Sequence, residues 1–210
     1  MKKIVLVSDI CLSTRFVFDL QERDRVQHWS AFLTAFANVI APVLTKHRVE
    51  VYKFLGDGWI YLVPPDIKYL KFVALVRDMF SGFYPVFDHH ITANLSFAPE
   101  IKGLTFGADL GELSRILVCG KTEFVGRALN VACRLQAAIK DAPPGKQILG
   151  HPYHNQVLLS IGLARRWNPH DIPGEVKVDQ VRRTLRNIAG ADYKDVPKLS
   201  FLGPFRNSRL

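Results

Sequence analysis

The sequence predicts an α+β fold, in which one mostly antiparallel sheet carries helices packed on one face. Two observations lead to this prediction. Apolar residues recur with strand and helix periods in the order strand, helix, hairpin, helix, hairpin, helix, strand. The chain also lacks GxGxxG and GxxxxGK[ST], the glycine-rich fingerprints that are typical of dinucleotide-binding and P-loop folds. We therefore expect any bound phosphate to be held without a P-loop.

The first half of the chain holds the more regular patterns. Gly56-Asp57-Gly58 lies between two apolar runs, and Asp-Gly in that setting is a strong hairpin signal. Apolar side chains recur at helical spacing before this hairpin. The elements expected here are a strand at 3–8, a helix at 24–47 with Asp24 as N-cap, a hairpin at 49–63, a helix at 66–82 and a strand or extended connection at 91–97.

The second half begins with GLTFGADLGELSRILV at 103–118, which we interpret as another hairpin turning near Asp109–Gly111. The polar stretch CGKTEF at 119–124 is expected to form a loop, followed by a helix at 126–140 that APPG ends. The remaining expected elements are a strand at 146–150, helical segments at 153–166 and 176–188, and a last strand at 199–205.

Length and composition indicate a globular protein of one domain, residues 1–210. The 210 residues are 48% hydrophobic and 22% charged, which is enough apolar material for a core. The net charge of +9 favours an anionic partner, such as nucleic acid, an anionic membrane or a polyphosphate ligand. Three cysteines without a CxxC pair fit a reducing compartment, and no run approaches the roughly 18 apolar residues of a membrane span. We expect a soluble, cytoplasmic protein.

Two acidic residues are expected at one end of the sheet. Asp9 follows the first predicted strand, and Asp57 lies at the tip of the first hairpin. If these strands are neighbours, the two carboxylates meet, and a cation between them would relieve their repulsion. Mg²⁺ suits such a place, because it takes hard oxygen ligands from one or two carboxylates, substrate phosphate and water.

The helix GRALNVACRLQAA carries two polar side chains on one face, because Asn130 and Arg134 are four residues apart. One interpretation is a solvated helix face. The other is a pair of donors aimed at a phosphate group.

Four stretches within residues 4–138 resemble the class III nucleotidyl cyclases. VSDICLST at 7–14 is similar to that family's first metal-binding strand, and KFLGDG at 53–58 to its K-x-x-G-D hairpin. GADLGEL at 107–113 resembles its G-x-x-x-G-E turn, and EFVGRALNVACRL at 123–135 resembles its acid-x-x-G-x-x-x-N-x-x-x-R segment. The stretches occur in the family's order with its internal spacings. The resemblance implies a ferredoxin-like cyclase sandwich.

The resemblance further implies two-metal catalysis. Asp9, Ile10 and Asp57 would hold two Mg²⁺ or Mn²⁺ ions per site. The ribose 3′-hydroxyl of a nucleoside triphosphate would attack the α-phosphate, and pyrophosphate would leave. In this family the site forms across a head-to-tail dimer, so a homodimer with two sites is implied.

The other site residues receive their roles from the same resemblance. Lys53 and Glu123, with Tyr52 beside them, would bind the base. Asn130 would position the ribose, and Arg134 would stabilise the negative charge that develops in the transition state.

The sequence departs from the family's pattern at several places. Leu12-Ser13-Thr14 stands where the family usually has Gly-Phe-Thr, and Lys198 is only a weak match for its phosphate-binding lysine. Tyr52 and Phe54 flank Lys53, and Glu123 is one methylene longer than Asp. Bulky neighbours and a longer acid would suit a base smaller than adenine.

These features resemble the stand-alone bacterial pyrimidine cyclases of anti-phage signalling, whose cyclic product acts on a separate effector. UTP is the leading substrate, CTP the next and ATP the alternative. Two other functions stay open: a nucleotide-binding module that has lost catalysis, and a nucleic-acid-binding protein suggested by the positive charge. The cyclase interpretation requires neither nucleic acid nor a membrane.

Overall fold

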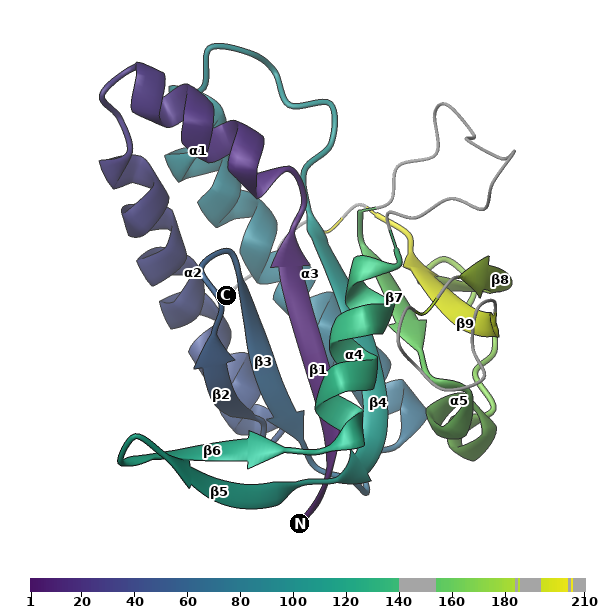
Figure 1. Cartoon of the computed structure of the whole chain (residues 1–210). Helices are drawn as coiled ribbons and strands as arrows, with labels where there is room; N and C mark the ends of the chain where they lie inside the picture. Colours follow the sequence, from purple (N-terminus) through teal and green to yellow (C-terminus); the bar gives the residue numbers. More distant parts are fainter. Residues whose placement is uncertain (140–153, 184, 186–193, 204, 206–210) are drawn as a thin grey trace.

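The computed structural model describes residues 1–139, 154–183, 185, 194–203 and 205 (Figure 1). Its main sheet has seven strands in the order β2-β3-β1-β4-β7-β9-β8. Neighbouring strands are antiparallel except β4 and β7, which are parallel. The strands are β1 Lys2–Ile10, β2 Glu50–Phe54, β3 Gly58–Val63, β4 Leu104–Glu112, β7 Gln156–Leu159, β8 Val176–Arg183 and β9 Lys194–Phe201.

The helices are α1 Ser13–Glu22, α2 Gln27–Lys46, α3 Tyr69–His90, α4 Arg127–Ala137 and α5 Ile161–Trp167, with a 3-10 turn at Thr92–Asn94. Helices α1, α2 and α3 cover one face of the main sheet as a helical layer, and α4 packs on the opposite face. Ile4 and Leu6 of β1 belong to the large core formed with α1, α2 and α3. Val5 and Val7 point to the opposite face and belong to a smaller cluster with α4. Because successive strand residues alternate between faces, β1 is apolar on both sides.

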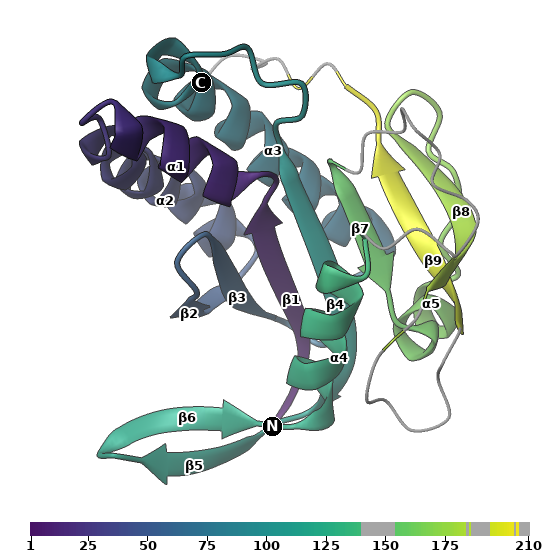
Figure 2. The same ribbon diagram turned by 45° about the horizontal axis from the view of Figure 1, so that its top comes forward.

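A two-stranded sheet stands apart from the main sheet as an arm (Figures 1 and 2). It consists of β5 Ser114–Val118 and β6 Lys121–Val125, which pair antiparallel around Cys119 and Gly120. The arm leads directly into α4, so it places residues of β6 near the start of that helix.

The longest apolar stripe of the helical layer lies on α2 and α3. The buried α2 residues are Trp29, Phe32, Phe36, Ile40 and Leu44. By length and composition α2 alone, within the described part of the chain, could cross a membrane, which corrects the expectation that no segment approaches that length. Phe32 and Phe36 pack edge-to-face on Phe83 of α3, so this stripe is used in the core.

The fold class is confirmed, as are the first strand, the long helix at α2, the β2–β3 hairpin and the helix at α4. The helix boundaries differ: α3 runs from Tyr69 to His90 instead of 66–82, and α2 begins at Gln27 with Val26, not Asp24, at the N-cap position. Asp24 has a φ of 53° in the preceding turn. The segment at 91–97 contains the short 3-10 turn instead of a strand.

The predicted turn at Asp109–Gly111 is wrong, because β4 runs straight through these residues and pairs with β1 from Lys2↔Glu112 to Ile10↔Leu104. The reason lies in helix packing. A Cβ on Gly107 would lie 2.2 Å from the carbonyl oxygen of Ala132, so the missing side chain lets α4 approach β4. The hairpin that does form is the arm, and CGKTEF contributes the strand β6 instead of a loop.

The end of the chain departs most from the prediction. The segment at 176–188 was expected to be helical, but Val176–Arg183 is the edge strand β8, paired with β9. The segment at 153–166 contains the strand β7 before the short helix α5. The last strand is Lys194–Phe201 instead of 199–205, and α1 was not predicted. The strand expected at 146–150 lies outside the described residues.

Candidate functional site

Asp9 and Asp57 are brought to the same end of the sheet, as predicted. β1 pairs with β3 in a register that sets Asp9 opposite Gly58, the residue after Asp57. The Ile10 N–H donates to the backbone carbonyl of Asp57 at 3.1 Å, which joins the strand end to the hairpin tip. A Cβ on Gly58 would lie 2.0 Å from the Ser8 carbonyl oxygen, so only glycine permits this close approach. The Gly-Asp-Gly sequence thus serves the strand contact and places the acid.

Ser13, which the sequence interpretation did not select, is part of this group. Its hydroxyl donates to Asp57 Oδ2 at 2.5 Å from the first residue of α1. The preceding Leu12 has a φ of 58°, the left-handed conformation that favours glycine and costs other residues about 1 kcal/mol. Leucine thus stands in a conformation that glycine adopts more readily, at the position where the family's pattern has glycine. The position of Ser13 in Leu12-Ser13-Thr14, directly after Asp9-Ile10-Cys11, was the signal that could have identified it.

A hollow of about 340 Å³ opens beside Asp57. The residues that line it come from α1, the start of α2 and the hairpin tip: Ser13, Thr14, Val17, Phe18, Gln21, Trp29, Gly56 and Asp57. Ligand volume is therefore available next to the Asp57 carboxylate.

The donor set at this end of the sheet fits Mg²⁺ or Mn²⁺. Among the described residues no group of three or more His, Cys, Asp or Glu side chains could enclose a metal. The ligands available here are the carboxylates of Asp9 and Asp57 and the backbone carbonyl of Ile10. The other coordination positions would be filled by phosphate and water. Hard divalent ions that act on phosphates are commonly held this way.

A β-bulge explains why Lys53 and Tyr52 act together. The β2–β3 register shifts between Val51, opposite Tyr61, and Lys53, opposite Ile60, so that Tyr52 is the extra residue. Ile60 lies on the α4 face, and Tyr52 packs against the same cluster. A bulge turns two successive side chains toward one side, where a regular strand would separate them.

Glu123 on β6 receives both side chains. Lys53 Nζ lies 2.9 Å from Glu123 Oε1, and the Tyr52 hydroxyl donates to Glu123 Oε2. The same Tyr52 oxygen accepts the Phe124 N–H at 2.8 Å. The Tyr52 and Lys53 hydrogen bonds lower the pKa of Glu123, and the Glu123 hydrogen bond raises the pKa of Lys53. Glu123 is therefore an ionised acceptor at neutral pH, held beside a cation.

Phe54 does not lie beside Lys53 and Glu123. The expectation that bulky side chains flank Lys53 on both sides is therefore wrong for Phe54. It pairs with Trp59 on the other face of the sheet, with ring centroids 5.3 Å apart. Tyr52, by contrast, packs on Phe124 with centroids 5.1 Å apart. The bulge again decides the outcome, because it puts Tyr52 and Phe54 on opposite faces.

Asn130 and Arg134 lie on the exposed side of α4. The buried residues of this helix are Ala128, Val131, Ala132 and Leu135, which face the sheet. No hydrogen bond or ion pair of the Asn130 or Arg134 side chain is found among the described residues. The two donors project away from the sheet, one turn apart, as the spacing predicted.

Lys198 lies away from this group. It belongs to β9, and its Nζ is 3.4 Å from Asp179 Oδ2 on the edge strand β8. The sheet order places these strands beyond β7, on the side away from the β2–β3 hairpin.

The sequence matches no protein-family model and no curated protein. The fold, however, is similar to those of solved nucleotidyl cyclases. The guanylyl cyclase Cya2 aligns with a TM-score of 0.65 and 18% identity, over 97% of this chain and 93% of that chain. The adenylyl cyclase CyaB from P. aeruginosa aligns with a TM-score of 0.62 and 15% identity, over 97% and 94%.

A third similar structure is the catalytic core of a rhodopsin-guanylyl cyclase with converted specificity, in complex with ATPαS. It aligns with a TM-score of 0.60 and 14% identity, over 95% of each chain. The described chain therefore has the fold of the catalytic domains of class III adenylyl and guanylyl cyclases.

Proposed function

We propose that residues 1–210 form one catalytic domain that converts a nucleoside triphosphate to its 3′,5′-cyclic monophosphate and pyrophosphate. The observation that carries this proposal is the junction of β1 with the β2–β3 turn, where Ile10 is hydrogen-bonded to Asp57 at 3.1 Å. It holds two acids at one sheet end, on a fold shared with nucleotidyl cyclases.

Asp9, Asp57 and the Ile10 carbonyl would hold the metal ions. When bound, two Mg²⁺ or Mn²⁺ ions supply Lewis acidity to the ribose 3′-hydroxyl and to the triphosphate. The chain's own part is positional. Ser13 fixes one oxygen of Asp57, and Arg134 would provide preorganised positive charge where negative charge develops on phosphorus.

The base would be read by the Lys53–Glu123 pair, with Tyr52 as the residue that positions Glu123. Lys53 can donate to a carbonyl oxygen, and ionised Glu123 can accept the N3–H of uracil. Both groups are then in their ordinary charge states, which favours UTP over CTP. Tyr52 supports a small base, because its bulky ring lies beside the pair, with its centroid 6.0 Å from Lys53 Nζ. ATP is the alternative, since its ring nitrogen and amine satisfy the same two groups.

The site would be completed by a second copy of the chain. Asn130 and Arg134 are exposed on the side of α4 away from the sheet that carries Asp9, which supports a role toward a neighbouring chain. The arm supports this arrangement. Its apolar side chains Ile116, Leu117, Val118 and Val125 are exposed, with Leu117 at 74%. An isolated two-stranded sheet with exposed apolar residues is marginal by itself and is stabilised by a partner.

We infer from the resemblance that the cyclic nucleotide is a second messenger, made in the cytoplasm for a separate effector in anti-phage defence. The pyrimidine product and this role go together. A demonstration of cyclic AMP as the main product would remove the support for both.

The decisive experiment is incubation of the purified protein with equal amounts of UTP, CTP, ATP and GTP and with Mn²⁺ or Mg²⁺. We expect one dominant cyclic nucleotide, cyclic UMP, because a site that pairs a base's polar edge leaves its own groups unpaired with a wrong base. Triphosphate binding without any cyclic product would instead support an inactive binding module.

The shared site is tested by mixing two inactive variants. Asp57→Ala and Arg134→Ala should each lower activity by about 10²–10³-fold, the usual loss for a preorganised charge. A mixture should recover activity, since one heterodimer site is intact. Asp195→Ala and Arg165→Ala are matched controls, because both side chains are exposed, and neither β9 nor α5, which carry them, neighbours β1 or the β2–β3 hairpin in sequence or strand order. Chain exchange without recovery would contradict a site built from two copies.

A further inference from the structure

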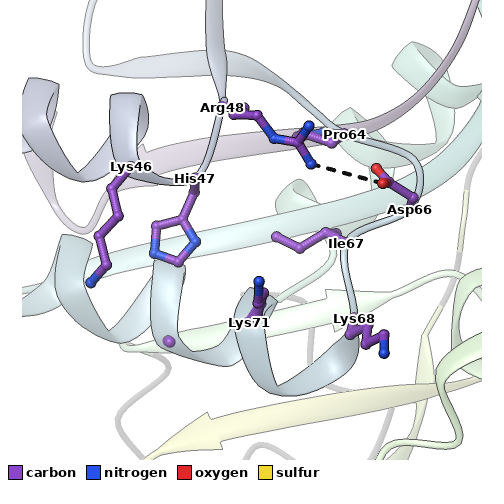
Figure 3. Close-up of a pocket in the computed structure, with 9 residues that line it drawn as sticks. Lys46, His47, Arg48, Pro64, Asp66, Ile67, Lys68 and Lys71 are labelled. Atoms are coloured by element: carbon purple, nitrogen blue, oxygen red, sulfur yellow. Dashed lines mark ion pairs between the residues drawn. The ribbon is translucent and has the colours of Figure 1, made fainter.

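A second pocket lies at the other end of the β2–β3 hairpin (Figure 3). Its volume is about 550 Å³, and it opens between the end of α2, the β3–α3 connection and the start of α3. The lining residues are Lys46, His47, Arg48, Pro64, Asp66, Ile67, Lys68, Lys71 and Ala74. β3 separates this pocket from Asp57, and its six residues span about 20 Å. The pocket is thus distinct from the proposed cyclase site.

The lining is strongly basic. It contains Lys46, Arg48, Lys68 and Lys71 but only one carboxylate, Asp66. Arg48 approaches Asp66 at 3.8 Å, as the dashed line in Figure 3 shows. Neither Lys68 nor Lys71 forms an ion pair with any residue that the structure describes. Lys46 Nζ lies 3.3 Å from Asp78 Oδ2, so Lys68 and Lys71 are the lining cations without an acid partner among the described residues. Unpaired cations around a concave site attract an anion.

The helix ends do not explain this charge. The C-terminal end of α2 and the N-terminal end of α3 both meet the pocket, and their dipoles have opposite signs there. The positive potential therefore comes from the side chains, which are long enough to close on a ligand.

His47 provides the independent observation. Its side chain is only 8% exposed, and Figure 3 shows the imidazole pointing into the space that Lys46, Ile67 and Lys71 also line. Its Nε2 is buried, and no hydrogen-bond partner for it is found in the described part of the chain. Asp78 Oδ2 is 4.0 Å away, beyond hydrogen-bond distance. A buried polar atom without a partner costs about 1–3 kcal/mol, so an acceptor that reaches this nitrogen would be favoured.

We propose that this pocket binds a phosphorylated small molecule of nucleotide size. Phosphate oxygens would lie between Lys68 and Lys71, beside the His47 imidazole. Pro64, Ile67 and Ala74 offer apolar contacts to the rest of the ligand. The volume lies in the range of small-molecule sites. No Phe, Tyr or Trp lines the pocket, which disfavours single-stranded nucleic acid, because such strands stack their bases on aromatic rings.

The His47 imidazole is a direct reporter of binding. In the free protein, burial, aided by Lys46 and Lys71 and opposed by Asp78, lowers the pKa of His47. A bound phosphate would add negative charge and raise that pKa, by about one unit for an opposite charge within roughly 4–6 Å. The experiment is an NMR titration of the histidine ring protons with inorganic pyrophosphate in EDTA, with His47→Gln to assign the signal. EDTA removes the metals on which pyrophosphate binding at Asp9 and Asp57 depends.

We expect pyrophosphate to raise the His47 pKa and to bind at least tenfold more weakly to Lys68→Glu/Lys71→Glu. The matched control is Lys2→Glu/Lys177→Glu, which makes the same change in net charge at exposed lysines elsewhere and should bind normally. A His47 pKa that does not move with pyrophosphate would overturn the proposal. The proposal would also be overturned if a short single-stranded RNA bound more tightly than pyrophosphate and Lys68→Glu/Lys71→Glu lost that binding, because the pocket would then be part of a nucleic-acid surface. No outcome depends on cyclase activity.

Discussion

Gly107→Ala tests the contact that positions α4. A Cβ at this position would lie 2.2 Å from the Ala132 carbonyl oxygen and 2.3 Å from the Gln136 backbone nitrogen. Both atoms are helix backbone, so neither can rotate away as a side chain would. To restore an ordinary contact, the helix must move away from β4 by about 1 Å, which removes roughly a quarter to a half of the attraction at the van der Waals contacts there.

This displacement should be costly. Overpacking a tight core commonly destabilises a protein by 1–3 kcal/mol, and here the obstacle is backbone, so we expect about 2–4 kcal/mol. The measurement is urea unfolding followed by circular dichroism. Gly162→Ala is the matched control, because Gly162 is in α5 and a Cβ there meets no atom within 4 Å. The control should be neutral or stabilise the protein by up to about 1 kcal/mol, as alanine is the better helix former.

If Gly107→Ala and Gly162→Ala had equal stabilities, the close packing of α4 on β4 would be refuted. The proposed cyclase adds a second readout. Because Asn130 and Arg134 project from this helix, a displaced α4 should lower catalytic activity even under conditions where the variant remains folded.

Three further variants test the site and its partner surface. Tyr52→Phe should raise the pKa of Glu123, because the carboxylate loses a hydrogen-bond donor to its ionised form. In the wild type the lowered pKa stabilises the folded protein above the ordinary carboxyl pKa, and this stabilisation is lost as the pH falls through the folded-state pKa. In the variant the same loss of stability should begin at a higher pH. A carboxyl ¹³C titration with an unchanged Glu123 pKa would contradict the network. Ser13→Ala should weaken Mn²⁺ binding about two- to tenfold in the presence of a non-hydrolysable triphosphate, because one hydrogen bond of roughly 1 kcal/mol is lost. An unaltered Mn²⁺ affinity, measured by electron paramagnetic resonance, would argue against a role of Ser13 in positioning Asp57. Leu117→Lys should weaken dimerisation in analytical ultracentrifugation without loss of stability, and an equally tight dimer would exclude the arm from the interface.

Much of the candidate site could be predicted from local sequence. The Asp-Gly hairpin could be predicted from the residues of its turn alone. Because the period of a helix is known, the spacing of Asn130 and Arg134 was enough to place both on one helix face. That Asp9 and Asp57 lie at the same sheet end followed from β1 and β3 being neighbours. The register between these strands, set by the close contact at Gly58, turned this expectation into a specific junction.

Other features were decided by contacts between distant segments. Gly107 and Gly111 suggested a turn, but their missing side chains serve the helix that packs on them, which local sequence cannot show. Val178, Val181 and Leu185 have helical spacing, yet β8 is a strand because β9 provides its hydrogen bonds. A strand's stability depends on its partner more than on its own residues.

The sequence by itself determined the fold class, the long core helix, and the presence of Asp9 and Asp57 at one end of the sheet. Only the tertiary structure decided that Tyr52 lies with Lys53 and that Phe54 does not. The physical reason is the bulge at Tyr52: strand residues alternate between faces, and one extra residue reverses that alternation for every side chain that follows. Bulges are set by pairing between strands, so the identity of Tyr52 alone does not predict one.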